Sequence, residues 1–337
     1  MTSAIYKGER TFATGVCEPI APGPGEVRLA VAYCGVCGTD VHIYHGAMDG
    51  RVAPPQIIGH EASAEVAEIG EGVDGLAVGD CVAVRPLRFG EPAPFDKGCS
   101  HVGKNLKFIG IDSPGAMQSS WTVPAYTLHK LPENVSLLSG ALVEPVAVAC
   151  HDVRLGEVAE DEHCVVIGGG PIGLLIGLVA RERGARVIIS EVNPARLRLA
   201  ETLGFDTVDP SQQDLVREVA GKTGDAMADV VFEVSGSAAG VEAMTELPNV
   251  RGRIVMVAIH PQPKPVNLFK FFWSEIRMIG ARLYEEQDFD EAIALAAGGK
   301  LSLDRLITQV RPIEEVGEAF AAIDANPAGI KYLIDCR

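Results

Sequence analysis

The pattern of hydrophobic and polar positions changes twice along the chain. Residues 1–145 contain short runs in which apolar and polar residues alternate, such as EVRLAVAYC and EASAEVAEIG, separated by turn-forming stretches such as APGPG and EGVDG. Alternation with a period of two is typical of half-buried strands, and Gly, Pro and Asp mark the turns between them. We therefore predict a β-rich, antiparallel, barrel-like domain.

A second pattern begins at about residue 146 and continues to residue 283. Apolar, β-branched runs such as HCVVIGG, ARVIISEV and DVVFEVSG alternate with longer stretches of helical periodicity. Strands that alternate with helices predict βαβ units, a parallel doubly wound sheet and helices on both of its faces. The fold class expected for the whole chain is therefore α/β, with a β-rich domain followed by a nucleotide-binding type of domain.

The last segment, residues 284–337, is too short to form a domain of its own. It contains two helical patterns, QDFDEAIALAAGG and IEEVGEAFAAI, and ends on the strand-like IKYLIDC. We expect it to pack back onto the first domain.

Charge and cysteine usage restrict the partners and the compartment. Acidic residues outnumber basic ones 45 to 29, which gives a net charge of −16 and disfavours nucleic acid and anionic membrane surfaces. The N-terminus lacks the apolar core of a signal peptide, and the apolar run 164–180 is interrupted by glycines and a proline, so no membrane association is expected. Eight cysteines without regular spacing are typical of reduced thiols and favour the cytoplasm.

A glycine-rich turn follows the first strand of the second domain. Gly168, Gly170 and Gly173 match the G-x-G-x-x-G pattern, with Pro171 and Ile172 between the last two glycines and an apolar helix after them. The glycines allow a tight turn and a close approach to a pyrophosphate, which then lies at the helix N-terminus. Because strand, glycines and helix occur in this order, we predict a dinucleotide site rather than an ordinary glycine-rich turn.

An acidic residue, Glu191, follows Gly173 by 18 residues, near the end of the next strand. A carboxylate there can accept hydrogen bonds from the ribose hydroxyls and would repel a 2′-phosphate, so NAD is predicted over NADP. Arg196, five residues further on, would soften that preference.

The stretch CGVCGTDVH contains Cys34 and Cys37 in C-x2-C spacing. A closed structural zinc site needs a second such pair, and this chain has none. A redox pair is expected at the head of a helix, whereas this stretch is rich in glycine and follows a strand-like run. An open catalytic metal site, with ligands from separate segments, is the remaining option.

Two other segments offer ligands for such a site. His60 and Glu61 follow the apolar PPQIIG, and Glu144 lies in the apolar ALVEPVAVACH, where an unpaired carboxylate is costly. Each residue alone has an ordinary explanation: His60 as a core histidine, Glu144 as a helix-terminal acid and Cys37 as a buried thiol.

Taken together, the motifs resemble those of the zinc-dependent medium-chain alcohol/polyol dehydrogenases along almost the full chain. The resemblance is carried by CGVCGTDVH, GHEASAEVAEIGEGV, GDCVAV, NLKFIG, LVEPVAVACH, GGGPIGLL and EVSG. It implies a GroES-like barrel that carries a catalytic zinc, and a Rossmann domain that binds NAD. It also implies oxidation of a secondary hydroxyl of a polyol, sugar acid or vicinal diol by a homodimer or homotetramer.

The resemblance also implies the roles of individual residues. Cys37 and His60 would bind zinc, and Glu144 would bind it directly or through its water, while Cys34 would not be a ligand. Glu61 would be an alternative ligand, and Asp40 would accept the free ring N–H of His60.

A proton relay is implied by the same motif. Thr39 would take the proton of the substrate hydroxyl, and His42 would lie at the far end of the relay.

The chain departs from many relatives where a second, structural zinc is bound. In PAPFDKGCSHVGKNLK only Cys99 remains of four cysteines, and Ala93, Asp96 and Lys107 occupy the other three places. One thiolate and one carboxylate cannot complete a four-coordinate site, so we predict one catalytic zinc per subunit and no structural zinc.

The substrate pocket also departs from the sorbitol-type pattern. The sorbitol-type pattern has an arginine three positions after the glycine that matches Gly280. In this chain Arg282 lies two positions after Gly280, and Leu283 occupies the third position. On a strand, a shift by one position would turn the guanidinium to the opposite face. Butanediol-, threonine-, idonate- and gulonate-type substrates all stay open. Two alternatives are a zinc-free quinone or enoyl reductase, which would lack the proposed ligands, and a dinucleotide-binding protein without turnover.

Overall fold

The computed structural model describes residues 1–337, which divide into two compact units. The first unit comprises Met1–Glu144 and Phe289–Arg337, and the second unit comprises Pro145–Asp288. Both boundaries fall inside helices, α4 (Val143–Leu155) and α10 (Glu286–Ala297). The hydrophobic pattern placed these boundaries after residues 145 and 283.

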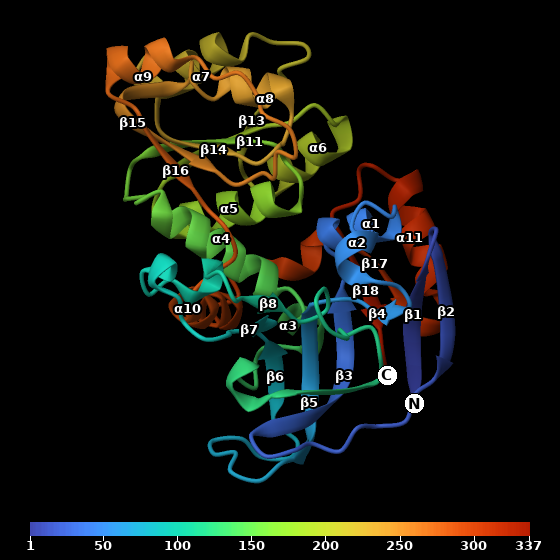
Figure 1. The fold of residues 1–337 in the computed structure, drawn as a ribbon. Coiled ribbons are helices and arrows are strands. Elements are labelled where there is room, and N and C mark those ends of the chain that lie inside the picture. Colours follow the sequence, from blue (N-terminus) through green and yellow to red (C-terminus); the bar gives the residue numbers. More distant parts are fainter. The chain divides into compact units, whose positions relative to one another are not determined.

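The first unit is built around a seven-stranded sheet with the strand order β10-β6-β5-β3-β18-β17, in which β9 also pairs with β3 (Figure 1). Its strands are β3 (Glu26–Gly35), β5 (Glu61–Ile69), β6 (Cys81–Val84), β9 (Ser120–Pro124), β10 (Leu128–Lys130), β17 (Ile307–Pro312) and β18 (Lys331–Asp335). All pairs are antiparallel except β17 with β18. The predicted β-rich character of this region is confirmed.

Two small sheets, four short helices and most of α10 complete the first unit. The small sheets have the orders β2-β1-β4 and β7-β8, and their strands are β1 (Thr2–Gly8), β2 (Thr11–Val16), β4 (Gln56–Ile57), β7 (Leu87–Arg88) and β8 (Lys107–Phe108). The helices are α1 (Gly38–Tyr44), α2 (Asp49–Val52), α3 (Leu137–Gly140) and α11 (Val316–Ala325). The C-terminal segment joins this unit because β18 pairs with β3, with Ile334 opposite Cys34.

The second unit contains a six-stranded sheet with the order β13-β12-β11-β14-β15-β16, and every pair in it is parallel. Its strands are β11 (His163–Ile167), β12 (Arg186–Ser190), β13 (Asp206–Val208), β14 (Ala228–Glu233), β15 (Pro248–Met256) and β16 (Arg277–Gly280). The strand order reverses between β11 and β14, as in doubly wound folds. The predicted parallel sheet is confirmed.

Helices cover both faces of this sheet, with α5 on one face and α7 and α8 on the other (Figure 1). They are α5 (Pro171–Glu182), α6 (Pro194–Thr202), α7 (Leu215–Thr223), α8 (Ala238–Ala243) and α9 (Leu268–Ser274). Side-chain caps explain three of their starts: Asn193, Asp214 and Ser237 each accept a hydrogen bond from a backbone N–H of the following turn. Buried residues of the sheet, α7 and α8 form an apolar core on one face.

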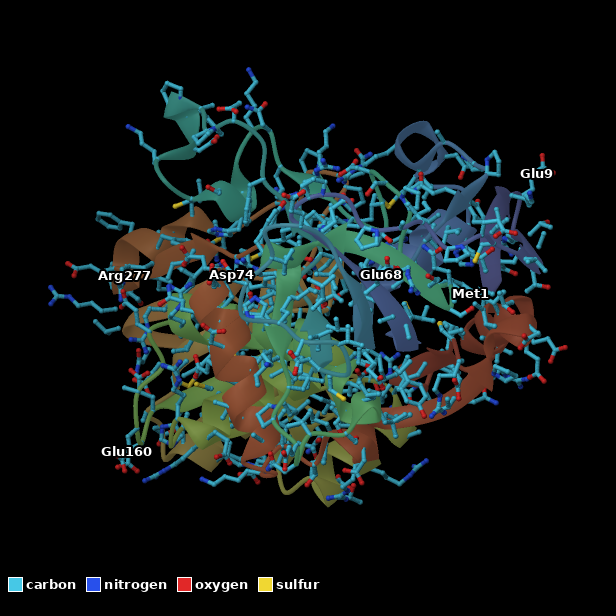
Figure 2. All side chains as sticks on the ribbon, turned by 90° about the horizontal axis from the view of Figure 1, so that it is seen from below. Met1, Glu9, Glu68, Asp74, Glu160 and Arg277 are labelled. Atoms are coloured by element: carbon cyan, nitrogen blue, oxygen red, sulfur yellow. The ribbon has the colours of Figure 1, made fainter.

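Charged side chains cover the surface of each unit. Glu9 projects from the first unit, and Glu160 and Arg277 project from the second (Figure 2). None of the helices is long and apolar enough to cross a lipid bilayer.

Candidate active site

The first group of candidate residues lies where β3 leads into α1. Cys37 is the N-cap of α1, and its backbone N–H donates to Oδ2 of Asp40 at 2.9 Å. Asp40 thereby fixes the first turn of the helix, because it satisfies a donor that the helix itself leaves unpaired. The thiol of Cys37 is consequently held just beyond the end of a core strand.

Strand pairing brings the second segment to the same place. Glu61 opens β5 and lies opposite Gly35, so Glu61 and His60 come next to Cys37 although they are more than twenty positions away in sequence. A side chain at position 35 would collide with Glu61, because a Cβ there would lie 2.2 Å from its Oε2. Gly35 is therefore required for this approach.

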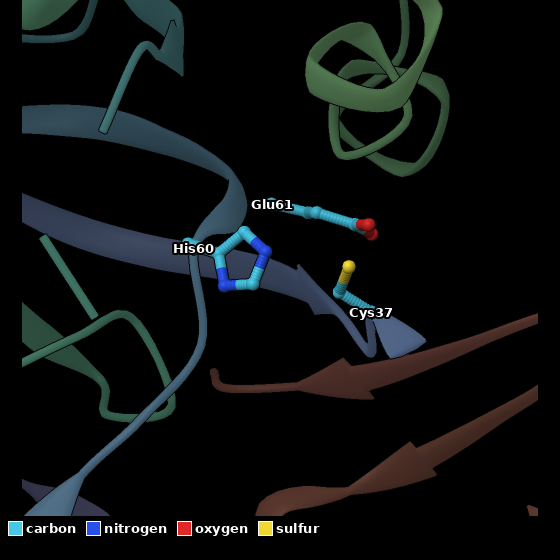
Figure 3. A group of neighbouring side chains, drawn as sticks. All are labelled: Cys37, His60 and Glu61. Atoms are coloured by element: carbon cyan, nitrogen blue, oxygen red, sulfur yellow. The ribbon is translucent and has the colours of Figure 1, made fainter. Parts of the chain in front are cut away.

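Cys37, His60 and Glu61 point their donor atoms toward one another (Figure 3), and one donor atom from each lies within 4.8 Å of the other two. His60 and Glu61 are buried, whereas Cys37 is half-buried, so the group is open on the thiol side. A thiolate, an imidazole and a carboxylate form a donor set that zinc accepts. These residues fit a zinc ion.

Asp40 lies beside His60 in the arrangement that such a site needs. Nδ1 of His60 is 3.6 Å from Oδ1 of Asp40, and both atoms are buried without a hydrogen bond. This separation is longer than a hydrogen bond. Because Asp40 lies on the Nδ1 side of the ring, the other ring nitrogen, Nε2, is left for the metal. Asp40 is then the acceptor closest to the free ring N–H.

The surroundings of His60 favour positive charge. Burial lowers the pKa of His60, but the Asp40 carboxylate and the Cys37 thiol raise it by more, so that the pKa stands well above its ordinary value. The negative surroundings that hold a proton on the imidazole also favour a divalent cation in its place.

Lys331 is a site residue that the sequence analysis missed. Its buried ammonium group donates to Oε1 of Glu61 at 2.6 Å and to the carbonyl oxygen of Val36 at 3.2 Å, and it also contacts Oε2 of Glu61. Burial lowers the pKa of Lys331, while Glu61, Cys37 and Glu144 raise it above its usual value. Glu61 is thus neutralised by a lysine, and binding a metal would require it to leave that partner.

One signal in the sequence could have revealed Lys331. It lies in the otherwise apolar IKYLIDC, and a lysine in a buried strand is rare unless a carboxylate pairs with it.

The other predicted residues of this group, Glu144, Thr39 and His42, differ in burial and in position. Glu144 is buried in the first turn of α4, and its charge acts on Lys331, but it is not one of the three converging donors. Thr39 and His42 lie three positions apart on α1, which places them on one side of the helix. Thr39 is half-buried and His42 is exposed, so the pair leads from the interior to solvent.

The lobe that holds structural zinc in many relatives is organised here by Asp96. Its two oxygens accept the backbone N–H groups of Ala93 and Lys104, each at 2.9 Å. The bond from Ala93 is the main reason that the pKa of Asp96 is lowered. Cys99 is exposed, and neither residue belongs to a group of converging metal donors.

A second group of potential donors, His151, Glu285 and Asp288, lies in the second unit. The Asp288 carboxylate already accepts from the Arg154 guanidinium at 2.6 and 2.9 Å and from Nδ1 of His151 at 2.7 Å. A guanidinium in direct contact takes the place that a cation would need, so we interpret this group as a buried ion-pair network.

The cofactor pocket lies at the carboxyl ends of the parallel strands. It is a cavity of about 320 Å³ whose lining includes Gly168, Gly170, Glu191 and Arg196. Gly168 has a φ of 110°, and a Cβ on Gly173 would lie 1.8 Å from the carbonyl oxygen of Gly168, so only glycine fits either position. Pro171 and Ile172 form the first turn of α5, directly after this glycine turn.

Glu191 is held at the end of β12 by backbone donors. Oε2 accepts the N–H of Gly169 at 2.9 Å, and Oε1 accepts those of Val192 and Asn193 at 2.7 and 2.8 Å. Its carboxylate is buried and fixed in position, and Nη1 of Arg196 lies 3.8 Å from it. A negative charge is therefore built into this wall of the pocket.

The rest of the cavity lining was not predicted as a site. These residues come from the region of α7, from the turn after β14 and from α8; they are Pro210, Leu215, Val234, Ser235, Ser237, Ala239, Gly240 and Ala243. The signal was the EVSG motif at the end of a strand, because ligands of doubly wound folds bind where the strand order reverses.

Comparison with known proteins decides the family. A model described as alcohol dehydrogenase GroES-like domain matches residues 23–133, and one described as zinc-binding dehydrogenase matches residues 171–298. A 2-dehydro-3-deoxy-L-galactonate 5-dehydrogenase from Pseudoalteromonas atlantica is 52% identical over 100% of this chain and 99% of its own. The chain belongs to the zinc-dependent medium-chain polyol dehydrogenase family.

Solved structures of this dehydrogenase family agree with the fold. A 2R,3R-butanediol dehydrogenase from Bacillus subtilis has a TM-score of 0.91 at 30% identity and covers 99% of both chains. A protein described as a short chain alcohol dehydrogenase from Escherichia coli CFT073, complexed with NADH, has a TM-score of 0.91 at 26% identity and also covers 99% of both chains.

The predicted combination of a GroES-like barrel and a Rossmann domain is therefore confirmed. This polyol dehydrogenase is an oxidoreductase that acts on secondary alcohols with zinc and a nicotinamide cofactor.

Proposed function

We propose that this polyol dehydrogenase oxidises a secondary hydroxyl of a sugar acid and reduces NAD. The observation that carries the substrate class is the 52% identity, over the whole chain, to a 2-dehydro-3-deoxy-L-galactonate 5-dehydrogenase. That substrate is a sugar acid with a secondary hydroxyl, and it is our first choice among the polyols, diols and sugar acids that the sequence left open.

Cys37 and His60 are proposed to hold one catalytic zinc, with Glu144 as the third protein group and Glu61 as its alternative. When bound, zinc acts as a Lewis acid toward the substrate oxygen. Asp40 keeps the His60 ring in the orientation that presents Nε2. The converging donor atoms and the position of Asp40 support this assignment.

The proton and the hydride leave the substrate separately. Thr39 would take the hydroxyl proton and His42 would carry it to solvent, and a bound NAD would supply the nicotinamide ring that accepts the hydrogen of the same carbon with its electron pair. The products are a ketone, NADH and one proton. The position of the two residues on α1, one half-buried and one exposed, supports the relay.

NAD is proposed over NADP because of Glu191. Three backbone N–H groups hold its carboxylate in the pocket wall, where it can accept from the ribose hydroxyls and would repel a 2′-phosphate.

A single zinc per chain is proposed because Asp96 uses both of its oxygens to hold the lobe together. Metal analysis of protein purified without chelator is expected to give one tightly bound zinc ion per chain, and two would contradict this.

We also propose a homodimer or homotetramer joined through α9 and the sheet edge. Leu268, Phe269, Phe272 and Trp273 of α9 and Met278 of the edge strand β16 are exposed apolar residues. Such a patch is typical of subunit interfaces.

The eight free thiols support a cytoplasmic location, and small-molecule substrates rather than nucleic acid or membrane are the expected partners.

The deciding experiment is a panel of substrates with NAD reduction as the readout. It contains 2-dehydro-3-deoxy-L-galactonate, L-idonate, L-gulonate, sorbitol, xylitol, butane-2,3-diol and L-threonine. We expect the highest kcat/KM with 2-dehydro-3-deoxy-L-galactonate. Preferred turnover of L-threonine, butane-2,3-diol or a neutral polyol would overturn the substrate class while leaving the dehydrogenase assignment intact.

A further inference from the structure

Glu233, the last residue of β14, is a fully buried carboxylate without a lysine or arginine partner. Oε1 accepts hydrogen bonds from the backbone N–H of Ser235 at 3.1 Å, the Ser235 hydroxyl at 2.5 Å and the backbone N–H of Gly236 at 3.1 Å. These three bonds hold the turn between β14 and α8. Part of that turn lines the cofactor pocket.

The second oxygen of Glu233 is bonded to His260, which follows β15. Nε2 of His260 lies 3.0 Å from Oε2 of Glu233, and because a carboxylate only accepts, the imidazole donates from Nε2. Nδ1 of the same ring is buried without a partner. The imidazole therefore makes one hydrogen bond, and that bond is to Glu233.

Backbone contacts tie the same two segments together. The N–H groups of Val257 and Ala258 both donate to the backbone carbonyl of Glu233 at 3.0 Å. Gly240 of α8 approaches the carboxylate so closely that a Cβ there would lie 2.7 Å from Oε1. Glu233 therefore accepts hydrogen bonds from both the turn 234–237 and the segment 257–260.

The position of these segments indicates which half of a dinucleotide they serve. In doubly wound folds the two halves of the cofactor bind on either side of the point where the strand order reverses, here between β11 and β14. Glu191 at the end of β12 lies on the adenosine side. The end of β15, with His260, lies beyond β14 on the nicotinamide side, whereas the turn after β14 also lines the cavity that contains Glu191.

We propose that His260 is a positioning residue for the nicotinamide half of the cofactor. Its bond to Glu233 holds the segment 257–260 beside the turn 234–237, so that the segment 257–260 forms the surface on which that half binds. This inference rests on the proposed function, because it requires the pocket to bind NAD.

The test compares two ligands that differ in the nicotinamide group. Titrations of the full-length protein would measure binding of NADH by its fluorescence and of ADP-ribose by calorimetry. His260→Leu is expected to weaken NADH about tenfold and to raise the KM for NAD with a smaller change in kcat, because the Glu233 oxygen loses its donor. ADP-ribose should bind within about twofold of wild type, since Glu191, the glycine turn and the bonds from Ser235 and Gly236 to the other oxygen of Glu233 are unchanged.

The matched control is His163→Leu. His163 begins β11, so it lies at the amino ends of the parallel strands, away from the carboxyl ends that bind the cofactor. Its side chain is 16% exposed against 15% for His260, and its Nδ1 also lies near an aspartate, at 4.0 Å from Oδ2 of Asp229. This variant should bind NADH like wild type. His260→Gln, whose amide can still donate to Glu233, should recover most of the NADH affinity.

Three results would overturn the inference: unchanged NADH binding in His260→Leu, equal weakening of NADH and ADP-ribose, or an equal loss in His163→Leu. If His260→Leu does not fold, His260→Asn replaces it, because its amide is too short to reach the carboxylate; it must then lose NADH affinity that His260→Gln retains. A wild-type protein that binds neither ligand would instead contradict the proposed function.

Discussion

The metal-donor group and the cofactor pocket are assembled in opposite ways. Cys37, His60, Glu61 and Lys331 come from three segments that meet only because β3 pairs with both β5 and β18. The glycine turn and Glu191 instead come from one continuous βαβ unit, residues 163–191. The first site therefore depends on long-range pairing, whereas half of the second depends on local geometry. This difference predicts that changes in one site will leave the other intact.

The largest expected effect comes from removing the proposed thiolate ligand. Cys37→Ser should lower kcat/KM about a thousandfold or more and release zinc, because the several kcal/mol that the metal contributes to the transition state are lost. Steady-state kinetics and atomic absorption measure these two changes. NADH binding should stay at the wild-type level.

The control is Cys34→Ser, which changes the other cysteine of the same motif. Cys34 is fully buried and is not one of the converging donors, so zinc content and kcat should stay close to wild type. Equal loss of zinc in both variants would mean that the C-x2-C spacing matters after all.

Lys331→Gln tests the long-range pairing of the first site. Removing the ammonium group leaves the Glu61 carboxylate buried without its charge partner, which should lower the free energy of unfolding by about 3 kcal/mol. Chemical denaturation measures this loss. Lys331→Arg should keep most of the stability, and a Lys331→Gln protein as stable as wild type would show that Glu61 is stabilised without the lysine.

Asp152 in the second unit offers the opposite case, a buried acid without a partner. Neither of its carboxylate oxygens has a hydrogen bond, and burial, followed by the charge of Asp288, raises its pKa well above the usual range. The folded protein therefore holds this proton more tightly than the unfolded chain does. Its contribution to stability is complete below the unfolded pKa of about 3.9 and is lost as pH rises toward the folded pKa.

Asp152→Asn should remove this loss of stability at high pH. The free energy of unfolding of the variant minus that of wild type should therefore increase by about 1–3 kcal/mol from pH 4.5 to pH 8. Denaturant titration at each pH measures both free energies. Asp161→Asn, which changes an exposed aspartate of the same unit, should show no such trend. Parallel pH curves for Asp152→Asn and wild type would exclude a protonated Asp152.

The smallest effect is expected at Glu191, where the change concerns specificity. Glu191→Ala removes the fixed negative charge beside the ribose, so the ratio of kcat/KM for NADP to that for NAD should rise about tenfold. Glu201→Ala, an exposed acid on α6, should leave the ratio unchanged. A ratio that does not move would place the coenzyme preference elsewhere in the pocket.

Local patterns explain why much of the fold could be predicted. Alternation of apolar residues identified β3 and β5, and the order of strand, glycines and helix identified β11 and α5. The backbone near Gly168 and Gly173 follows from residue type alone, because no other residue fits these positions. Arg282 shows the limit of such reasoning: β16 ends at Gly280, so the strand on which its orientation was argued does not reach it.

By itself, the sequence determined the two architectures, the glycine turn and the residue types that can bind a metal, since these depend on periodicity, backbone freedom and donor chemistry. Only the tertiary structure decided that Glu61 is paired with Lys331, 270 positions away, and that Glu233 is bonded to His260. The physical reason is the same in both cases. A buried carboxylate that stays charged must find a donor, but strand pairing and loop position decide which donor is within reach.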